Sequence, residues 1–451
     1  LVASMDEGPL ELEYGIRAKP RHGVVDDDAA HDVLPGPPTR DSMYHVPGAG
    51  PPPGHMHMVA QRWGLWLTPL SWESRVYIST SDELSAFCER IGNEPVIAVD
   101  TEFLRERTYY PKLCLVQVGT PTEIGAIDPI LIEDLSPLAH IFADERVTKV
   151  FHACGQDLEV ILDGMGVTCT SVFDTQVAAA FLGMRQQVSY ASLVEVYAGV
   201  RLPKAESLTD WSRRPLDPEQ LTYAEDDVRY LPGIYDRMVE QLVERDRLAW
   251  VQPEMAEATD PSHMHRDPRE AYLRLKRSSS LTRRQLAIAR EVCAWREQTA
   301  ASHDVPRKWV LSDEVVVEVC KRAPRNRDRL RKIRGTDQLS ERDVRDLLDA
   351  VHAGEEVPGS ACPQPERHAH PSAEVESVVD LMVALVRIVS EKSGIATQLI
   401  ATRDDLVEFA QDRSKSRLAT GWRHELAGKQ LESLLEGSVG LTVRDGRIEV
   451  I

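Results

Sequence analysis

Five short apolar runs between residues 96 and 173 constrain the fold of this chain more than any other feature. They cover 96–99, 113–118, 123–127, 147–151 and 170–173. Runs of this length, bounded by turn residues such as Gly119 and Pro121, predict β-strands. Helical periodicity appears over 157–162 and 216–242. Three strands joined by short turns, followed by strands separated by helices, predict a mixed α/β sheet over 75–250.

The remaining sequence predicts helices, a linker and a poorly ordered extension. Residues 1–70 are rich in Pro, Gly, His and Asp without a period, so we expect little order there. Residues 270–355 read as helices, with Ser312 as an N-cap. The proline-rich stretch 356–371 predicts a linker, and helical periodicity returns after it. The pattern over 305–312 recurs over 395–402, so we interpret 372–451 as a second, diverged copy of the helical domain.

Composition predicts the compartment. No apolar run approaches the length of a membrane span, and the N-terminus lacks the pattern of a signal peptide. The seven cysteines form no CxxC pair, which indicates a reducing compartment and argues against a zinc ribbon or a disulfide framework. We therefore expect a cytoplasmic protein without a membrane partner, and we expect a monomer.

The charge of the chain reverses locally. Its formal net charge is −19, which argues against a protein that simply coats nucleic acid. Between residues 266 and 334, however, 19 Lys and Arg stand against 9 Asp and Glu. A basic module on an acidic chain predicts a localised anionic partner.

Four carboxylates and a tyrosine are the candidates for chemistry. Asp100 and Glu102 close the first strand, where alternation places both on one face. Asp157 follows the fourth strand at the start of a helix, and Tyr223 and Asp227 share a helix face at i and i+4. Taken singly, these residues read more simply as exposed acids, a helix cap and a core aromatic. Together they offer a set of oxygen ligands that suits divalent cations. We expect the acids between Tyr223 and Asp227 to be solvated.

The order D-x-E, then D, then Y-x-x-x-D resembles the DEDDy exonucleases, and the surrounding motifs narrow the resemblance to the ribonuclease D family. The motifs that carry it are Val99-Asp100-Thr101-Glu102-Phe103, His152-Ala153-Cys154-Gly155-Gln156-Asp157-Leu158-Glu159, Phe173-Asp174-Thr175-Gln176, 204–211 and 223–227. Residues 283–335, with 305–310 at their centre, resemble the HRDC (helicase and RNase D C-terminal) module. The family's second motif often carries an acid where this chain has Gln156, a position that is not a ligand.

The resemblance implies an RNase H-like α/β exonuclease domain followed by all-α HRDC-type domains. It implies 3′→5′ hydrolysis of RNA to nucleoside 5′-monophosphates with two divalent ions, Mg²⁺ or Mn²⁺. Asp100 would bridge both ions, Glu102 and Asp227 would complete the first site, and Asp157 would serve the second. Tyr223 would orient the attacking water. The expected partner is RNA, in particular tRNA precursors with 3′ extensions.

The resemblance also suggests substrate contacts. In the exonuclease domain these are Thr101, Phe103, His152, Gln176, Lys204, Ser207 and Trp211, although Trp211 reads equally well as a core residue. In the HRDC module the basic candidates for RNA binding are Arg283, Arg284, Arg307, Lys308, Arg331 and Lys332.

Two alternatives stay open at this point. A DNA 3′→5′ exonuclease of the Werner type shares the carboxylate set, although no P-loop accompanies it here. A non-catalytic RNA-binding scaffold would be expected to have lost at least one acid, and all four are present.

Overall fold

The computed structural model describes residues 75–203, 209–264, 267–364 and 371–451, which all lie in one compact unit, Gly48–Ile451. The expectation for residues 1–70 lies outside this range. None of the helices in the described ranges is both long and apolar enough for a membrane span.

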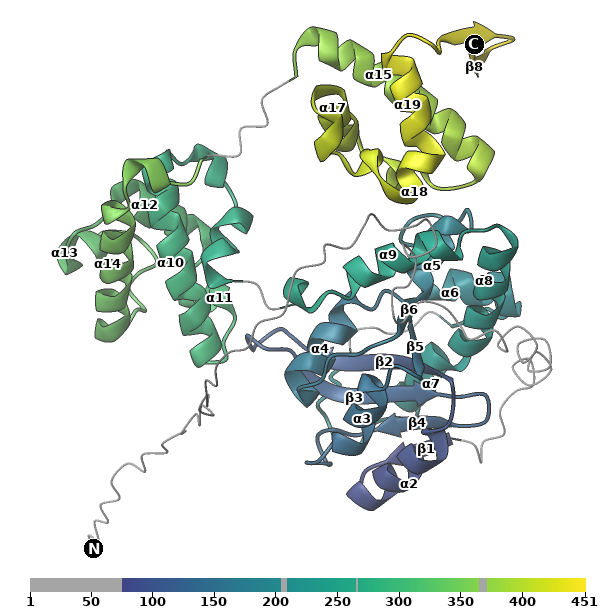
Figure 1. Cartoon of the computed structure of the whole chain (residues 1–451). Helices are drawn as coiled ribbons and strands as arrows, with labels where there is room; N and C mark the ends of the chain where they lie inside the picture. The colour runs from purple at the N-terminus through teal and green to yellow at the C-terminus, as the bar shows by residue number, and fades with distance from the viewer. Residues whose placement is uncertain (1–74, 204–208, 265–266, 365–370) are drawn as a thin grey trace, which may run out of the picture. The chain divides into compact units, whose positions relative to one another are not determined.

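The centre of the exonuclease region is a six-stranded mixed sheet (Figure 1). Its order is β1-β4-β3-β2-β5-β6; β3 pairs antiparallel with β2 and β4, and the other pairs are parallel. The predicted mixed sheet is therefore confirmed. The strands are β1 (Arg75–Ile78), β2 (Val96–Leu104), β3 (Lys112–Gly119), β4 (Ile124–Ile127), β5 (Thr148–Phe151) and β6 (Val172–Asp174).

Helices cover both faces of the sheet. Alternation in β2 places Ile97 and Val99 in a core cluster with residues of α2, α3 and α4, whereas Ala98 packs in the cluster that includes α5 and α8. The second face carries Asp100 and is also covered by α7. The helices are α2 (Ser81–Ile91), α3 (Ser136–Ala143), α4 (Gly155–Met165), α5 (Thr175–Phe181), α6 (Tyr190–Ala198), α7 (Pro218–Arg229), α8 (Leu231–Glu244) and α9 (Leu248–Ala258).

The first helical module has its own apolar core. The long helix α10 packs against α12 and α14, and Thr282 and Gln285 form a capping box at its start. This module ends in α14, which continues one residue into the expected linker. Its helices are α10 (Arg283–Ser302), α11 (Arg307–Val310), α12 (Asp313–Arg322), α13 (Arg327–Leu330) and α14 (Glu341–Glu356), with 3-10 turns η2 (Pro261–His263), η3 (Pro268–Arg274) and η4 (Ser278–Ser280) before it and η5 (Gly359–Ala361) after it.

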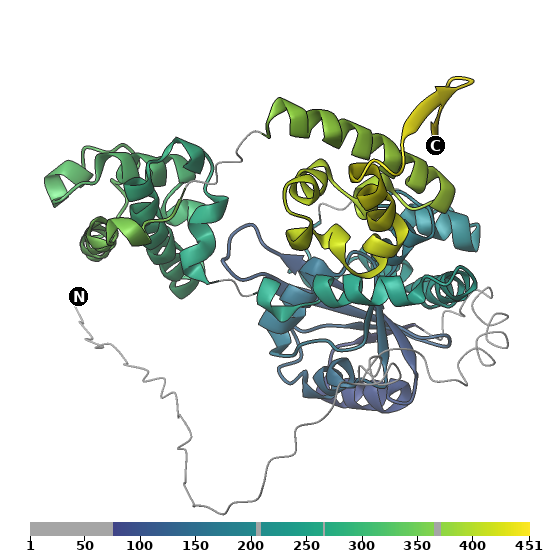
Figure 2. The ribbon, with the colours of Figure 1, turned by 45° about the horizontal axis from the view of Figure 1, so that its top comes forward.

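The second helical module opens as the first does. Its long helix α15 runs beside shorter helices (Figure 2). The starts of α15, α16 and α17 each lie 90 residues after those of α10, α11 and α12. That 372–451 is a second, diverged copy of the helical domain stays a prediction. The elements are α15 (Ala373–Ser393), α16 (Thr397–Ile400), α17 (Arg403–Gln411), η6 (Arg413–Lys415), η7 (Arg417–Ala419), α18 (Gly421–Arg423), the π-helical turn η8 (His424–Gly428) and α19 (Lys429–Leu435).

The C-terminal end departs from the helical expectation for 372–451. Strands β7 (Leu441–Arg444) and β8 (Arg447–Val450) form a hairpin. Asp445 and Gly446 connect them with φ angles of 51° and 75°. A two-residue Asp-Gly loop with positive φ at both positions matches the right-handed twist of the strands, which is the physical reason for the correction.

The second helical module shares a core with the exonuclease domain. One apolar cluster contains Phe181 of α5, Val251 of α9 and Trp422 of α18. The Trp422 ring stacks on Trp250 at 5.8 Å and meets Phe181 edge-on at 5.0 Å. Removing either partner would expose large aromatic surfaces to water.

Candidate active site

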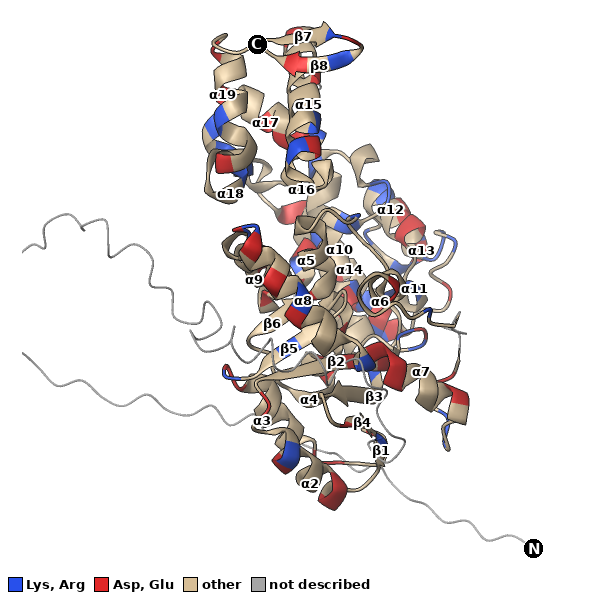
Figure 3. Cartoon of the chain, turned by 90° about the vertical axis from the view of Figure 1, so that its right-hand side faces the viewer, with Lys and Arg blue, Asp and Glu red and all other residues tan. Residues whose placement is uncertain are grey.

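The middle of β2 and the last turn of α7 bring three carboxylates together. Oxygens of Asp100, Glu102 and Asp227 lie within 4.8 Å of one another, and all three side chains are half-buried. Asp100 and Glu102 share a face because they are two residues apart on a strand. Acidic segments meet where β2 approaches α7 (Figure 3).

Helix α7 is anchored so that Tyr223 and Asp227 face the same way. Asp217 and Gln220 form a capping box at its start, and Pro218 occupies the first turn. The Tyr223 hydroxyl donates a hydrogen bond to the Asp227 carboxylate, as the i, i+4 spacing predicts.

Asp157 lies beside this trio rather than within it. It is 8% exposed in the first turn of α4, and its Oδ1 accepts a hydrogen bond of 2.6 Å from the Thr101 hydroxyl. Thr101 lies between Asp100 and Glu102 on β2, so this hydroxyl links the fourth carboxylate to the strand that carries the first two.

A further carboxylate, Asp174, holds the turn that leads to Asp157. Its two oxygens accept hydrogen bonds of 3.1 and 2.9 Å from the backbone N–H groups of Ala153 and Cys154. Ala153 adopts a left-handed conformation with φ of 62°. Such strain persists only where neighbouring groups hold it. Asp174 is also the N-cap of α5, whereas its hold on the turn before Asp157 depends on the fold.

Burial and mutual repulsion raise the proton affinity of the cluster. Burial, followed by the charges of Asp157, Asp227 and Glu102, raises the pKa of Asp100 well above its usual value. Burial, together with Asp227 and Asp157, raises the pKa of Glu102 to about 8. Burial raises the pKa of Asp157 to about 6, although the hydrogen bond from Thr101 lowers it. Burial likewise raises the pKa of Asp227 to about 7, although the hydrogen bond from Tyr223 lowers it. Crowded, half-buried carboxylates with oxygen-only donors fit a hard divalent cation.

The two acids between Tyr223 and Asp227 are not solvated, contrary to our expectation. Arg75 of β1 lies 2.9 Å from Glu225, and Arg229 lies 3.5 Å from Asp226. The carboxylates are only 14% and 17% exposed. Arg75 reaches Glu225 from β1, a contact that helical spacing does not show, whereas Arg229 and Asp226 form an i, i+3 pair within α7.

Two of the expected substrate residues hold a loop. His152 Nε2 and Gln176 Nε2 each lie 3.0 Å from the carbonyl oxygen of Val188, and His152 Nδ1 lies 2.9 Å from the Thr175 hydroxyl. The loop before α6 is thereby fixed. Tyr190, which the sequence did not single out, donates to the Asp226 carbonyl oxygen at 2.8 Å and so ties α6 to α7.

The other expected substrate residues differ in environment. Trp211 is 5% exposed and packs at 6.1 Å from the Tyr223 ring, which is a core position. Phe103 is half-buried against the sheet's other core cluster, and Thr101 is 5% exposed. Lys204 and Ser207 lie outside the described residues.

The loop that carries Trp211 is anchored by a buried ion pair. The Arg214 guanidinium contacts the Asp128 carboxylate and donates to the carbonyl oxygens of Trp211 and Cys114 at 2.7 Å each. Asp128 is fully buried at the end of β4 and also accepts from the Tyr77 hydroxyl. Neither Arg214 nor Asp128 belongs to a motif that the sequence indicated.

The basic residues of the first helical module fall into two groups. Arg283, Arg284 and Arg331 donate to backbone carbonyl oxygens, those of Arg284 and Arg331 lying next to the ends of α14. Arg307 is exposed and lies 3.7 Å from Glu297. Lys308 and Lys332 are exposed, without an ion pair among the described residues.

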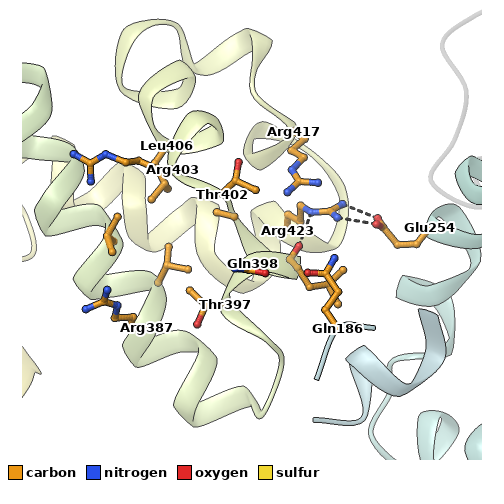
Figure 4. A pocket seen from close by; sticks show the side chains of 14 residues that line it. Gln186, Glu254, Arg387, Thr397, Gln398, Thr402, Arg403, Leu406, Arg417 and Arg423 are labelled. Carbon is orange, nitrogen blue, oxygen red and sulfur yellow. Dashed lines mark hydrogen bonds and ion pairs between the residues drawn. The ribbon is translucent and has the colours of Figure 1, made fainter. Parts of the chain in front are cut away.

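A separate cavity of about 760 Å³ carries four arginines (Figure 4). Arg423 pairs with Glu254 of α9, Arg417 with Asp405, and Arg403 with Glu376 and Asp380; only Arg387 has no ion pair among the described residues. Because nearby carboxylates offset the arginines, the cavity has little net charge. We interpret it as a gap between packed elements.

Comparison with known proteins defines the class. A 3′-5′ exonuclease domain model matches residues 75–243, and an HRDC domain model matches residues 285–351. The fold and the carboxylate site therefore belong to a 3′→5′ exonuclease with an appended HRDC domain.

Full-length relatives define the family. The chain is 37% identical over 385 residues to ribonuclease D of Acidiphilium cryptum, covering 84% of this chain and 98% of that protein. It is 40% identical to ribonuclease D of Jannaschia sp., covering 83% and 98%. The crystal structure of Escherichia coli RNase D, described as an exoribonuclease involved in structured RNA processing, matches with 32% identity and a TM-score of 0.70, covering 80% and 99%. The chain belongs to the ribonuclease D family of 3′→5′ exoribonucleases.

Proposed function

We propose that this enzyme trims 3′ extensions from RNA precursors, tRNA precursors in particular, and releases nucleoside 5′-monophosphates with the help of two divalent ions. The convergence of Asp100, Glu102 and Asp227 within 4.8 Å carries this proposal. The charges of Asp157, Asp227 and Glu102 add to burial in raising the pKa of Asp100. Asp100 would contact both ions, Glu102 and Asp227 would hold the first, and Asp157 would serve the second.

The ions, Mg²⁺ or Mn²⁺, would supply a nucleophile at neutral pH and stabilise the charge of the leaving 3′ oxygen. The chain's own groups orient the reactants. The Tyr223 pKa is raised above its usual value, first by burial and then by Asp227, so its phenol stays protonated. A neutral phenol beside Asp227 orients a water by hydrogen bonding rather than removing its proton.

The test compares a tRNA precursor carrying a 3′ extension with DNA of the same sequence. We expect digestion of the RNA from its 3′ end with Mg²⁺ or Mn²⁺, no digestion with EDTA, and 5′-monophosphates as products on chromatography. Products carrying a 3′-phosphate, or an undiminished rate in EDTA, would rule out the proposed chemistry. Faster digestion of the DNA would favour the Werner-type alternative.

A further inference from the structure

Gln117 in the middle of β3 is a buried amide without a hydrogen-bond partner. Its side chain is 0% exposed, and among the described residues neither Oε1 nor Nε2 has a partner. An apolar side chain of similar size would avoid the desolvation that this amide suffers. A buried polar group that costs stability points to a role in function.

The strand register places Gln117 beside the carboxylate cluster. Gln117 is directly opposite Asp100 in the antiparallel pairing of β2 and β3. Directly opposite residues project from the same face of a sheet, with Cβ atoms about 4.5–5.5 Å apart. The other cross-strand neighbour is Ala126, and Ala224 of α7 lies in the core cluster on this face. Of these neighbours, Asp100 alone offers a side-chain acceptor.

Two other carboxylates of the site already show the same arrangement. Asp157 accepts from the Thr101 hydroxyl at 2.6 Å, and Asp227 accepts from the Tyr223 hydroxyl. Both donors are neutral. A neutral donor fixes the orientation of a carboxylate and leaves its full negative charge for a cation, whereas Lys or Arg would offset that charge.

We infer that Gln117 is a positioning residue for Asp100: when a divalent ion is bound, the Gln117 Nε2–H would donate to the Asp100 carboxylate and fix the oxygen that faces the ion. This inference rests on the proposed metal site. It assigns a neutral donor to each of three carboxylates, and it explains why a polar side chain stands among the buried apolar residues of β3.

The test is Gln117→Met in the full chain, which removes the amide and keeps the length of the side chain. Leu115→Met is the matched control, because Leu115 is also 0% exposed and lies opposite Glu102 on β3. Three quantities are measured: Mn²⁺ affinity by calorimetry, thermal unfolding of the metal-free protein, and kcat and KM on RNA. For Gln117→Met we expect Mn²⁺ affinity and kcat to fall by about 10- to 100-fold. We expect KM to change little and the metal-free protein to unfold at the wild-type temperature or above.

The outcomes separate this inference from the metal site itself. If wild type binds Mn²⁺ and Gln117→Met matches Leu115→Met within twofold in affinity and kcat, the positioning role is overturned and the metal site stands. A metal-free Gln117→Met that unfolds well below Leu115→Met, with unchanged Mn²⁺ affinity, also overturns it, since the amide then serves the core. If Gln117→Met does not fold, Gln117→Asn withdraws the amide by one methylene, and wild-type Mn²⁺ affinity there overturns the inference. No Mn²⁺ binding by wild type overturns the metal site and the inference together.

Discussion

At the scale of single residues, the hydroxyl of Tyr223 has a defined partner. It donates to Asp227, and its ring packs near the buried Trp211. The ring is therefore held by the core, and the hydroxyl belongs to the site. Because the ring packs in the core and the hydroxyl contacts the site, a substitution that removes only the hydroxyl tests its role alone.

Tyr223→Phe keeps the ring and removes the hydroxyl. We predict a fall in kcat of about 10²-fold, typical of a lost proton-positioning contact, with little change in RNA affinity. Single-turnover kinetics together with an equilibrium binding assay would measure both. A wild-type kcat would show that Tyr223 serves only as a core aromatic.

Asp100→Asn removes the charge at the centre of the cluster. We predict no detectable digestion of RNA, because the loss of a ligand removes metal affinity. The metal-free variant should unfold at or above the wild-type temperature, since repulsion from Glu102, Asp157 and Asp227 is relieved. Digestion assays and thermal unfolding would check the two parts. Digestion at the wild-type rate would show that the site is assigned wrongly.

The raised pKa values predict how the metal-free protein responds to pH. Glu102, Asp157 and Asp227 have pKa values of about 8, 6 and 7 in the folded state, against 4.5 for Glu and 3.8 for Asp. Between pH 4 and 8 the folded state therefore holds protons that the unfolded chain has lost, and stability falls as pH rises. We predict an unfolding temperature that decreases over this range in EDTA and recovers with Mg²⁺. In Asp227→Asn the decrease should be shallower, and an equal decrease would contradict the assignment.

At the scale of elements, the sequence predicted strands β2 to β6, but it did not predict β1 or the hairpin of β7 and β8. The runs behind β2 to β6 stand out as apolar, whereas β1 (Arg75–Ile78) has one fully buried residue in four and was not predicted. The hairpin of β7 and β8 was also missed, although Asp445-Gly446 was a readable signal. Spacing predicted that Asp100 and Glu102 share a face and that Tyr223 meets Asp227. It could not predict the roles of Asp174, Arg75 or Gln117, because those depend on which strands and helices become neighbours.

The basic side chains of the first helical module are of two kinds: some donate to backbone carbonyl oxygens, and others are exposed without an ion pair in the part of the chain that the structure describes. Arg331 donates to the carbonyl oxygens of Thr336 and Leu339, whereas Lys308 and Lys332 are exposed. We predict that the double variant Lys308→Gln, Lys332→Gln keeps the wild-type unfolding temperature. Its RNA affinity should depend less on salt, with the slope reduced by about 1.4 if both contact phosphates of a single strand.

Arg331→Gln is the contrasting variant. It should lower the unfolding temperature, because three carbonyl oxygens, those of Thr336, Asp337 and Leu339, lose their donor. Affinity measured across a salt series would decide the matter. An unchanged slope in the double lysine variant would indicate that this surface does not contact RNA.

At the scale of the whole molecule, a substitution of Trp422 tests the core that the second helical module shares with the exonuclease domain. It is 6% exposed, stacks on Trp250, and its Nε1 donates to Glu254 at 3.0 Å. We predict that Trp422→Ala lowers the free energy of unfolding by about 3–5 kcal/mol. Loss of RNA digestion on mild heating should accompany it, although Trp422 belongs to the C-terminal module.

Trp309→Ala is the control for this prediction, since Trp309 is 53% exposed. It should change the free energy of unfolding by less than about 0.5 kcal/mol. Denaturant unfolding followed by both circular dichroism and activity would compare the two variants. Equal stabilities would show that the two regions do not fold as one.

The two helical modules begin with the same succession of helices, but the second packs into the core cluster of the exonuclease domain, whereas the first has a separate cluster, against which Tyr109 of the exonuclease domain packs. Because the second module buries its apolar face against the exonuclease domain, changes in that face must be matched by changes in α5, α8 and α9. The first module also meets the exonuclease domain through polar contacts: the Tyr109 hydroxyl donates to Glu297, and the backbone N–H groups of Tyr109 and Tyr110 donate to Asp304. Away from these contacts its surface can be altered while the nuclease stays intact, so new RNA preferences in this family would be expected to arise there, with the C-terminal module changing only as the catalytic domain changes.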